Sequence, residues 1–266
     1  MRKINEIIKT NNEGDISAYI NGELAHKLAP FVLFDAVHAK TDSTWGFSWH
    51  PHSGVATLTY IYGAELHHQD TTSEGGVIEK GGMQWMQAGN GIWHKEFYES
   101  IAGRVDAHQL WVQLPPGVED EPASYIDLAA RDLPVIDERI KVVTGSYRGV
   151  KAPINLPVEV TYLDITLKAG EEMEVEIPSD QTRTIVFPRV GELEIAQSKI
   201  GNQEFAILEE SDATLKVLAL ADSQFIVAAT APSPHPLIKS RGQIHTNQDS
   251  LEKAKRNIAA LQIKLI

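Results

Sequence analysis

Short stretches in which apolar and polar residues alternate recur along the chain, separated by turn residues. The stretch at 55–62 is rich in β-branched and aromatic residues and is followed by Gly63. A period of two places successive side chains on opposite faces of a strand. Many short strands with turns between them are typical of a β-sandwich or β-barrel, so the pattern predicts an all-β protein. The other strand-like stretches are 83–87, 109–114, 161–167, 173–177, 184–187, 191–195 and 225–228.

A proline-rich segment divides these strands into two series. Residues 115 to about 135 carry four prolines and the acidic run 119–121, which is typical of a connection. We therefore expect two β domains of similar build, at 1–130 and 131–266. No histidine occurs between 109 and 234, so the second domain is expected to be a structural partner or a lid for the first.

One helix is predicted near the C-terminus. Its apolar residues recur every three or four positions, at Leu251, Ala254, Ile258 and Leu261. Asn247 or Asp249 is a suitable cap for its start. We expect the apolar face of this helix to dock onto a β domain.

Two segments carry candidate metal ligands at positions i and i+2. They are His50-Pro51-His52 and His94-Lys95-Glu96. On neighbouring strands, such pairs would direct three imidazoles and one carboxylate into one pocket, which suits a first-row transition metal. The alternative is that these are ordinary polar residues at strand ends. The metal site is favoured because eight of the ten histidines lie within the first 108 residues.

Charge and composition exclude several classes of function. The net charge of −12 and the pI of about 5.3 argue against a nucleic-acid surface, which needs clustered lysine and arginine. The chain has no cysteine, so disulfides and thiolate ligands are ruled out. The N-terminus lacks the apolar core of a secretory signal, and no apolar run is long enough for a membrane helix. We expect a cytoplasmic protein without a membrane partner.

The segments around these ligand pairs resemble the pirin family of the cupin superfamily. The similar segments are 46–54, 57–60, 68–71, 84–96, 110–115 and 145–150. The resemblance implies two jelly-roll β-barrel domains face to face, with metal in the N-terminal one alone. The pirin ligand set falls on His50, His52, His94 and Glu96, all intact here. Iron is the metal most associated with pirins; nickel, cobalt, copper, manganese and zinc are alternatives.

The resemblance also implies a function. Pirin-like bacterial proteins include quercetinases, which open a flavonol ring with dioxygen, and Glu96 would serve as the catalytic base. Trp49, Trp85, Met86 and Trp93 are either walls for an aromatic substrate or core packing, and core packing is favoured. A non-enzymatic, metal-dependent regulator that binds a protein partner is the alternative, followed by a cupin that binds metal without turnover. We expect a monomer.

The chain departs from the pirin pattern beside the first ligand pair. Ser53 stands where pirins often have arginine, and Ala56 stands where they often have an acidic residue. The second change removes a hydrogen-bond partner for a ligand histidine. His68 follows the family pattern without being a ligand, and we expect it to have a structural hydrogen-bond role. His67 is expected to point to the opposite face.

Overall fold

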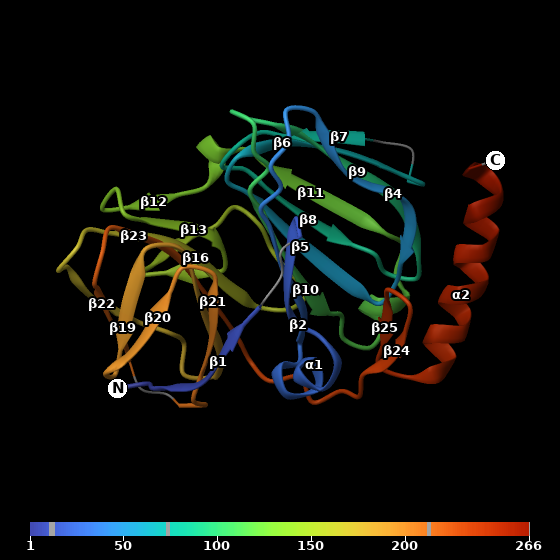
Figure 1. Ribbon diagram of the computed structural model, residues 1–266. Coiled ribbons are helices and arrows are strands. Elements are labelled where there is room, and N and C mark those ends of the chain that lie inside the picture. Colours follow the sequence, from blue (N-terminus) through green and yellow to red (C-terminus); the bar gives the residue numbers. More distant parts are fainter. Residues whose placement is uncertain (11–13, 73–74, 212–213, 266) are drawn as a thin grey trace. The chain divides into compact units, whose positions relative to one another are not determined.

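The computed structural model describes residues 1–10, 14–72, 75–211 and 214–265, and strands dominate it (Figure 1). Contacts divide these residues into two compact units. The first unit comprises residues 14–131 with 233–265, and the second comprises residues 1–10 with 132–232. The prediction of an all-β protein with one C-terminal helix is confirmed. None of the described helices has the length and apolar character needed to cross a membrane.

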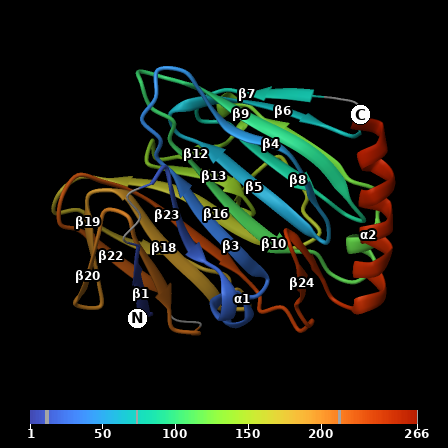
Figure 2. The same ribbon diagram turned by 45° about the vertical axis from the view of Figure 1, so that its right-hand side comes forward.

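The first unit contains a six-stranded and a four-stranded antiparallel sheet, whose strands are labelled in part in Figure 1 and in part in Figure 2. In spatial order, the larger sheet is β11 (Ser124–Leu128), β8 (Met83–Gln87), β5 (Val55–Ile61), β10 (Ala107–Gln113), β3 (Phe31–Val37) and β2 (Ile16–Ile20). The smaller sheet is β4 (Thr44–His52), β9 (Ile92–Ser100), β6 (Ala64–Asp70) and β7 (Gly75–Ile78). Helix α1 (Gly22–Leu28), the hairpin of β24 (Ile238–Ser240) and β25 (Gln243–His245), and helix α2 (Gln248–Gln262) complete this unit.

The second unit repeats the two-sheet design. In spatial order, its larger sheet is β1 (Ile4–Lys9), β21 (Glu204–Leu208), β18 (Arg183–Val190), β23 (Ser223–Thr230), β16 (Val160–Leu167), β13 (Ile140–Thr144) and β12 (Val135–Ile136). The smaller sheet is β17 (Glu172–Val175), β22 (Leu215–Ala219), β19 (Glu192–Ile195) and β20 (Ser198–Gly201), and β14 (Ser146–Tyr147) pairs with β15 (Val150–Lys151).

On two strands of the first unit, the buried side chains change from apolar to polar along the strand. On β6, the buried side chains pass from Ala64 and Leu66 to His68, and on β9 they pass from Tyr98 to Glu96 and His94. The apolar ends join one hydrophobic cluster that also takes in residues of β3, β5, β7 and β10. The same alternation places the polar side chains of His68, Glu96 and His94 next to this cluster on the buried face of the sheet.

The ends of the chain differ from the predicted division at residue 130. Strand β1 pairs with β21, so residues 1–10 belong with the second unit. Residues 233–265 belong with the first unit, because the hairpin and α2 pack there. The predicted connection also contains a strand, β11, which pairs with β8. Its short sequence between prolines gave no signal, because sheet pairing rather than local pattern forms it.

Helix α2 confirms the predicted cap and apolar face. The Asn247 side chain accepts a hydrogen bond from the Ser250 backbone at 2.8 Å. Leu251, Ala254 and Ile258 are buried, and Leu261 at the end of the face is half-buried. The helix packs beside β9, where the Trp93 indole donates to the Ile258 carbonyl at 2.9 Å.

A buried carboxylate, Glu119, fixes the chain just before α2. Glu119 is fully buried and accepts hydrogen bonds from the backbone and hydroxyl of Thr246, from the Asn247 amide and from His245. Burial alone would raise the pKa of Glu119, but the bonds from His245 and Thr246 outweigh it, and the pKa lies below the ordinary value. The ionised carboxylate therefore stabilises the fold.

We expect Glu119→Gln to lower the free energy of unfolding by about 2 kcal/mol at neutral pH, because an amide nitrogen would face buried donors. Since the folded pKa is lowered, this contribution is present above the ordinary glutamate value of 4.5 and is lost as the pH falls below it. Urea unfolding at several pH values measures it, with exposed Glu79→Gln as the control. A difference between wild type and Glu119→Gln that does not shrink on acidification would contradict this account.

Candidate metal centre

Strands β4 and β9 bring the two predicted ligand pairs together. The strands are antiparallel neighbours, and His50 lies directly opposite His94 in their register. The register shifts between Phe47 and His50, at the point where β4 enters the site. The prediction that these i, i+2 pairs lie on adjacent strands is therefore confirmed.

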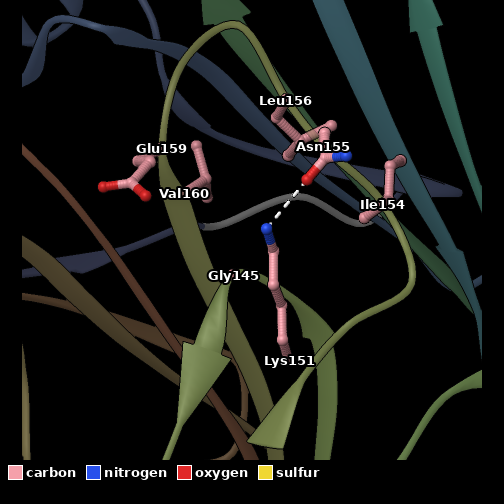
Figure 3. Close-up of a pocket in the computed structure, with 7 residues that line it drawn as sticks. All are labelled: Gly145, Lys151, Ile154, Asn155, Leu156, Glu159 and Val160. Atoms are coloured by element: carbon pink, nitrogen blue, oxygen red, sulfur yellow. Dashed lines mark hydrogen bonds between the residues drawn. The ribbon is translucent and has the colours of Figure 1, made fainter. Parts of the chain in front are cut away.

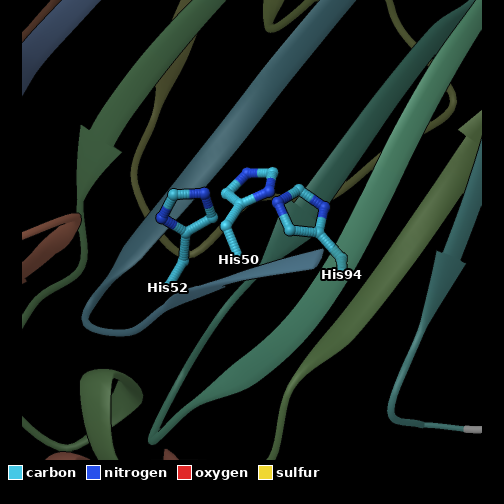
Figure 4. Close-up of side chains that lie close together, drawn as sticks. All are labelled: His50, His52 and His94. Carbon is cyan, nitrogen blue, oxygen red and sulfur yellow. The ribbon is translucent and has the colours of Figure 1, made fainter. Parts of the chain in front are cut away.

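Three imidazoles face one another at this place (Figure 4). One ring nitrogen from each of His50, His52 and His94 lies within 4.8 Å of the others. The ring centroids are 4.8 Å apart for His50 and His52, 4.3 Å for His50 and His94, and 5.0 Å for His52 and His94. His52 and His94 are buried, while His50 is partly exposed. The three donors converge as a metal site requires.

Backbone carbonyls set the tautomers of the β4 histidines. Nδ1 of His50 lies 2.7 Å from the Ser48 carbonyl, and Nδ1 of His52 lies 2.9 Å from the Gly242 carbonyl. A carbonyl oxygen only accepts hydrogen bonds, so each Nδ1 must carry the proton. The lone pair of Nε2 then stays free, which is the arrangement found in metal-binding histidines.

The β9 pair provides buried atoms that have no hydrogen-bond partner. Both ring nitrogens of His94 and the Oε1 atom of Glu96 are buried and unpartnered among the described residues. These two residues are 1% and 2% exposed, and His94 Nδ1 lies 4.0 Å from Glu96 Oε1. An unpaired buried polar atom costs about 1–3 kcal/mol. A cation between these donors would remove that cost, so the residues present fit a divalent metal.

A second cluster overlaps the first at His94. One ligand atom from each of His68, His94 and Glu96 lies within 4.8 Å of the others. His68 also donates from Nε2 to Asp70 at 2.7 Å, which confirms the hydrogen-bond role expected for it, and its Nδ1 is unpartnered. Within this distance Glu96 groups with His68 and His94, not with His50 and His52. His94 is therefore the residue common to both clusters.

Burial keeps the imidazoles of His52 and His94 in their neutral form. It lowers the pKa of His52 to about 3, with a further contribution from His50. Burial also lowers the pKa of His94 well below its ordinary value, and the three neighbouring histidines add to this effect. Burial raises the pKa of Glu96, against the opposing influence of His68, His50 and Gln109. Neutral imidazoles are the form that binds metal.

Two residues of β10 adjoin the site although the sequence analysis did not single them out. Gln109 Nε2 lies 3.5 Å from a carboxylate oxygen of Glu96, and the Trp111 indole donates to Gln109 at 2.8 Å. The Trp111 ring lies 4.5 Å from that of His52. Gln109, Trp111 and Gln113 alternate with Leu110 and Val112, so the period of the strand already placed them on one face.

A polar row extends from Gln109 across the larger sheet of the first unit. Its members, which lie directly opposite one another on five neighbouring strands, are Asp35, Gln109, Thr59, Gln84 and Asp127. Burial raises the pKa of Asp35 to about 6 and also raises that of Asp127. The barrel wall beside the site is therefore polar, and no local sequence motif reveals it because its members come from separate strands.

The four residues considered as substrate walls have other surroundings. Trp85 and Met86 are buried in the core, as favoured from the sequence. Trp93 bonds to α2, and Lys95 lies over the ring of Trp49 at 5.5 Å. Two other aromatic rings lie beside candidate ligands: the centroid of the Trp111 ring is 4.5 Å from that of His52, and the centroid of the Phe47 ring is 5.9 Å from that of His50.

Two cavities and one exposed cluster lie outside the histidine group. A cavity of about 240 Å³ in the first unit is lined by Trp111, by residues of β2 and β3, and by residues 239–244. A smaller one of about 90 Å³ lies in the second unit, where Lys151 donates to Asn155 (Figure 3). His67 points away from His68 as expected, with Nε2 at 2.9 Å from Glu65 and 3.5 Å from Glu99.

Comparison with known proteins agrees with this architecture. The pattern of the Pirin family matches residues 14–112, and that of the Pirin C-terminal cupin domain matches residues 162–261. A pirin-like protein from Caulobacter vibrioides is 32% identical over 224 residues, which are 80% of this chain and 79% of that protein.

Solved structures share the fold. The crystal structure of quercetin 2,3-dioxygenase from Acinetobacter baumannii is similar with a TM-score of 0.88 at 25% identity, over 98% of this chain and 97% of that one. A bacterial pirin from Escherichia coli in complex with nickel(II) has a TM-score of 0.65 at 19% identity, over 87% of this chain and 98% of that one.

Two-sheet β domains with histidines gathered inside one of them define a cupin protein with a candidate metal centre. The matches to both family patterns and to the Caulobacter protein identify the family within this class. This chain belongs to the pirin family, as the sequence resemblance indicated.

The two overlapping clusters predict different sensitivities to mutation. We expect His50→Ala, His52→Ala and His94→Ala each to weaken Co²⁺ binding by more than about 100-fold, above the range typical for residues that only support ligands. His68→Asn should weaken it by about 10–100-fold at most, because His68 donates to Asp70 and would support the site without binding the metal. Competition with a chromophoric chelator measures each affinity.

His67→Ala is the matched control, because His67 adjoins His68 on β6 but faces the exposed glutamates. It should bind Co²⁺ as the wild type does. A loss in His68→Asn as large as that in His94→Ala would contradict this assignment and place the metal among His68, His94 and Glu96.

Proposed function

We propose that this pirin is a metal-dependent dioxygenase that acts on a flavonol such as quercetin, with the metal held by His50, His52, His94 and Glu96. The observation that carries the proposal is a set of donor atoms gathered around His94. His50 and His52 each direct Nδ1 to a backbone carbonyl, which leaves Nε2 free, and both ring nitrogens of His94 and the Oε1 atom of Glu96 have no partner among the described residues. Similarity to the Acinetobacter quercetin 2,3-dioxygenase supports the choice of substrate.

The bound metal would supply Lewis-acid chemistry that favours the ionised form of a substrate hydroxyl. Glu96 is the residue placed to accept the hydroxyl proton on a carboxylate oxygen. Gln109 contacts the other oxygen at 3.5 Å and orients the carboxylate.

The surroundings of the donors suit an aromatic substrate. The Trp111 ring provides a flat wall beside His52, and the polar row that contains Gln109 and Thr59 offers hydrogen-bond partners for hydroxyl groups. Iron is the metal we propose first, with nickel, cobalt, copper, manganese and zinc as alternatives that the same ligands accept. The cytoplasmic location and the monomeric state stay predictions.

Oxygen uptake on addition of quercetin, to protein whose metal content has been counted, tests this function. We expect uptake to rise in proportion to occupancy and to fall by at least about 100-fold in Glu96→Gln, as for loss of a general base. Part of the metal should remain in that variant, because the three histidines are intact.

Glu99→Gln is the control on the same strand, since Glu99 is 56% exposed and points away from the site. It should consume oxygen at the wild-type rate. Absence of uptake from protein fully loaded with each of the proposed metals would overturn the flavonol function and favour the regulatory alternative, in which the metal governs binding of a protein partner. Full activity in Glu96→Gln would overturn the role of Glu96.

A further inference from the structure

We propose that the C-terminal hairpin β24–β25 is a positioning element of the metal centre, and that it acts through the backbone carbonyl of Gly242 on His52. This inference rests on the proposed metal site. Gly242 lies in the turn of the hairpin, 190 positions from His52 in sequence. Its carbonyl accepts the hydrogen bond from Nδ1 of His52 at 2.9 Å, so the hairpin determines which nitrogen of His52 faces the other histidines.

The turn leaves little room for a side chain at this position. Gly242 has a φ of +76°, and a Cβ atom there would lie 3.2 Å from both His52 Nδ1 and the Pro51 carbonyl oxygen. Both the backbone conformation and the close approach therefore favour glycine. Any larger residue would press on His52 itself.

Direct backbone contacts hold the hairpin against the residues that follow His52. Ser53 forms a parallel bridge with Gln243, and the Ile244 backbone donates to the Ser53 carbonyl at 3.0 Å. The next residue, Gly54, has a φ of +71°, and a Cβ atom on it would collide with the Ile244 carbonyl. The segment 51–54 is thus shaped to receive the hairpin.

A buried chain of side chains locks the same contact. The Ser53 hydroxyl lies 2.8 Å from Nε2 of His245, and Nδ1 of His245 lies 3.2 Å from Glu119. A hydroxyl, an imidazole and a carboxylate in series resemble a hydrolytic triad. All three side chains here are fully buried, however, with relative exposures of 0%. No substrate can reach Ser53, so the chain is a strut that fixes the hairpin.

A hydrogen-bond acceptor that orients a ligand histidine, as the Gly242 carbonyl orients His52, influences a metal site without touching the metal. Loss of the hydrogen bond that orients a ligand histidine typically costs 10–100-fold in metal affinity. Because the Gly242 carbonyl belongs to the backbone, a substitution cannot delete it and can only displace it or His52. The hairpin therefore couples the C-terminal segment of the chain to the geometry of the centre.

The test is Co²⁺ binding to Gly242→Ala, compared with wild type and with Gly149→Ala. Gly149 has a nearly equal φ of +78° with nothing within 4 Å of a Cβ atom, so its variant carries the same backbone strain without the contact. We expect Gly242→Ala to lose about 10–100-fold in Co²⁺ affinity and to change the visible Co²⁺ spectrum. Gly149→Ala should match the wild type in both.

The outcomes separate this inference from the proposed function. Wild-type protein that binds no Co²⁺ would overturn the metal centre and the inference together. Normal Co²⁺ binding and an identical spectrum in Gly242→Ala would overturn the inference alone. Should Gly242→Ala not fold, ¹H–¹⁵N spectra of Zn²⁺-loaded wild type decide: the inference requires a proton on Nδ1 of His52, and a proton on Nε2 overturns it.

Discussion

One constraint governs the structure: imidazole and carboxylate groups are buried next to one another, and several of their nitrogen and oxygen atoms have no hydrogen-bond partner among the described residues. Burial of an unpaired polar group disfavours folding, and His94 has both ring nitrogens in that state. Burial also holds the pKa of His94 well below its ordinary value, so protonation does not relieve the cost. A cation bound beside His94, the residue common to both clusters, would give these buried atoms a partner.

Hydrophobic packing on the same strands offsets the free-energy cost of burying these polar atoms. Tyr98 and Leu66 lie in a hydrophobic cluster two residues along from Glu96 and His68. Burial of such apolar side chains contributes about 1.5–3 kcal/mol each, which offsets the cost of the polar end. The same four-stranded sheet thus carries the candidate metal centre and part of the hydrophobic core.

The sequence sufficed for the strand content, for the capped helix and for the two ligand pairs, because period and spacing are local properties. It did not reveal β11 or the polar row, which exist only through pairing between distant strands. The change at Ala56 predicted the loss of a partner for a ligand histidine. The structure shows a partner from the far end of the chain, the Gly242 carbonyl. Local pattern could not indicate that contact.

Anomalous diffraction from crystals of the protein loaded with one transition metal would test the central claim most directly. The account predicts a single strong peak among the Nε2 atoms of His50 and His52, a ring nitrogen of His94 and an oxygen of Glu96. A peak at the exposed group of Glu65, His67 and Glu99, or no peak in metal-saturated crystals, would contradict it.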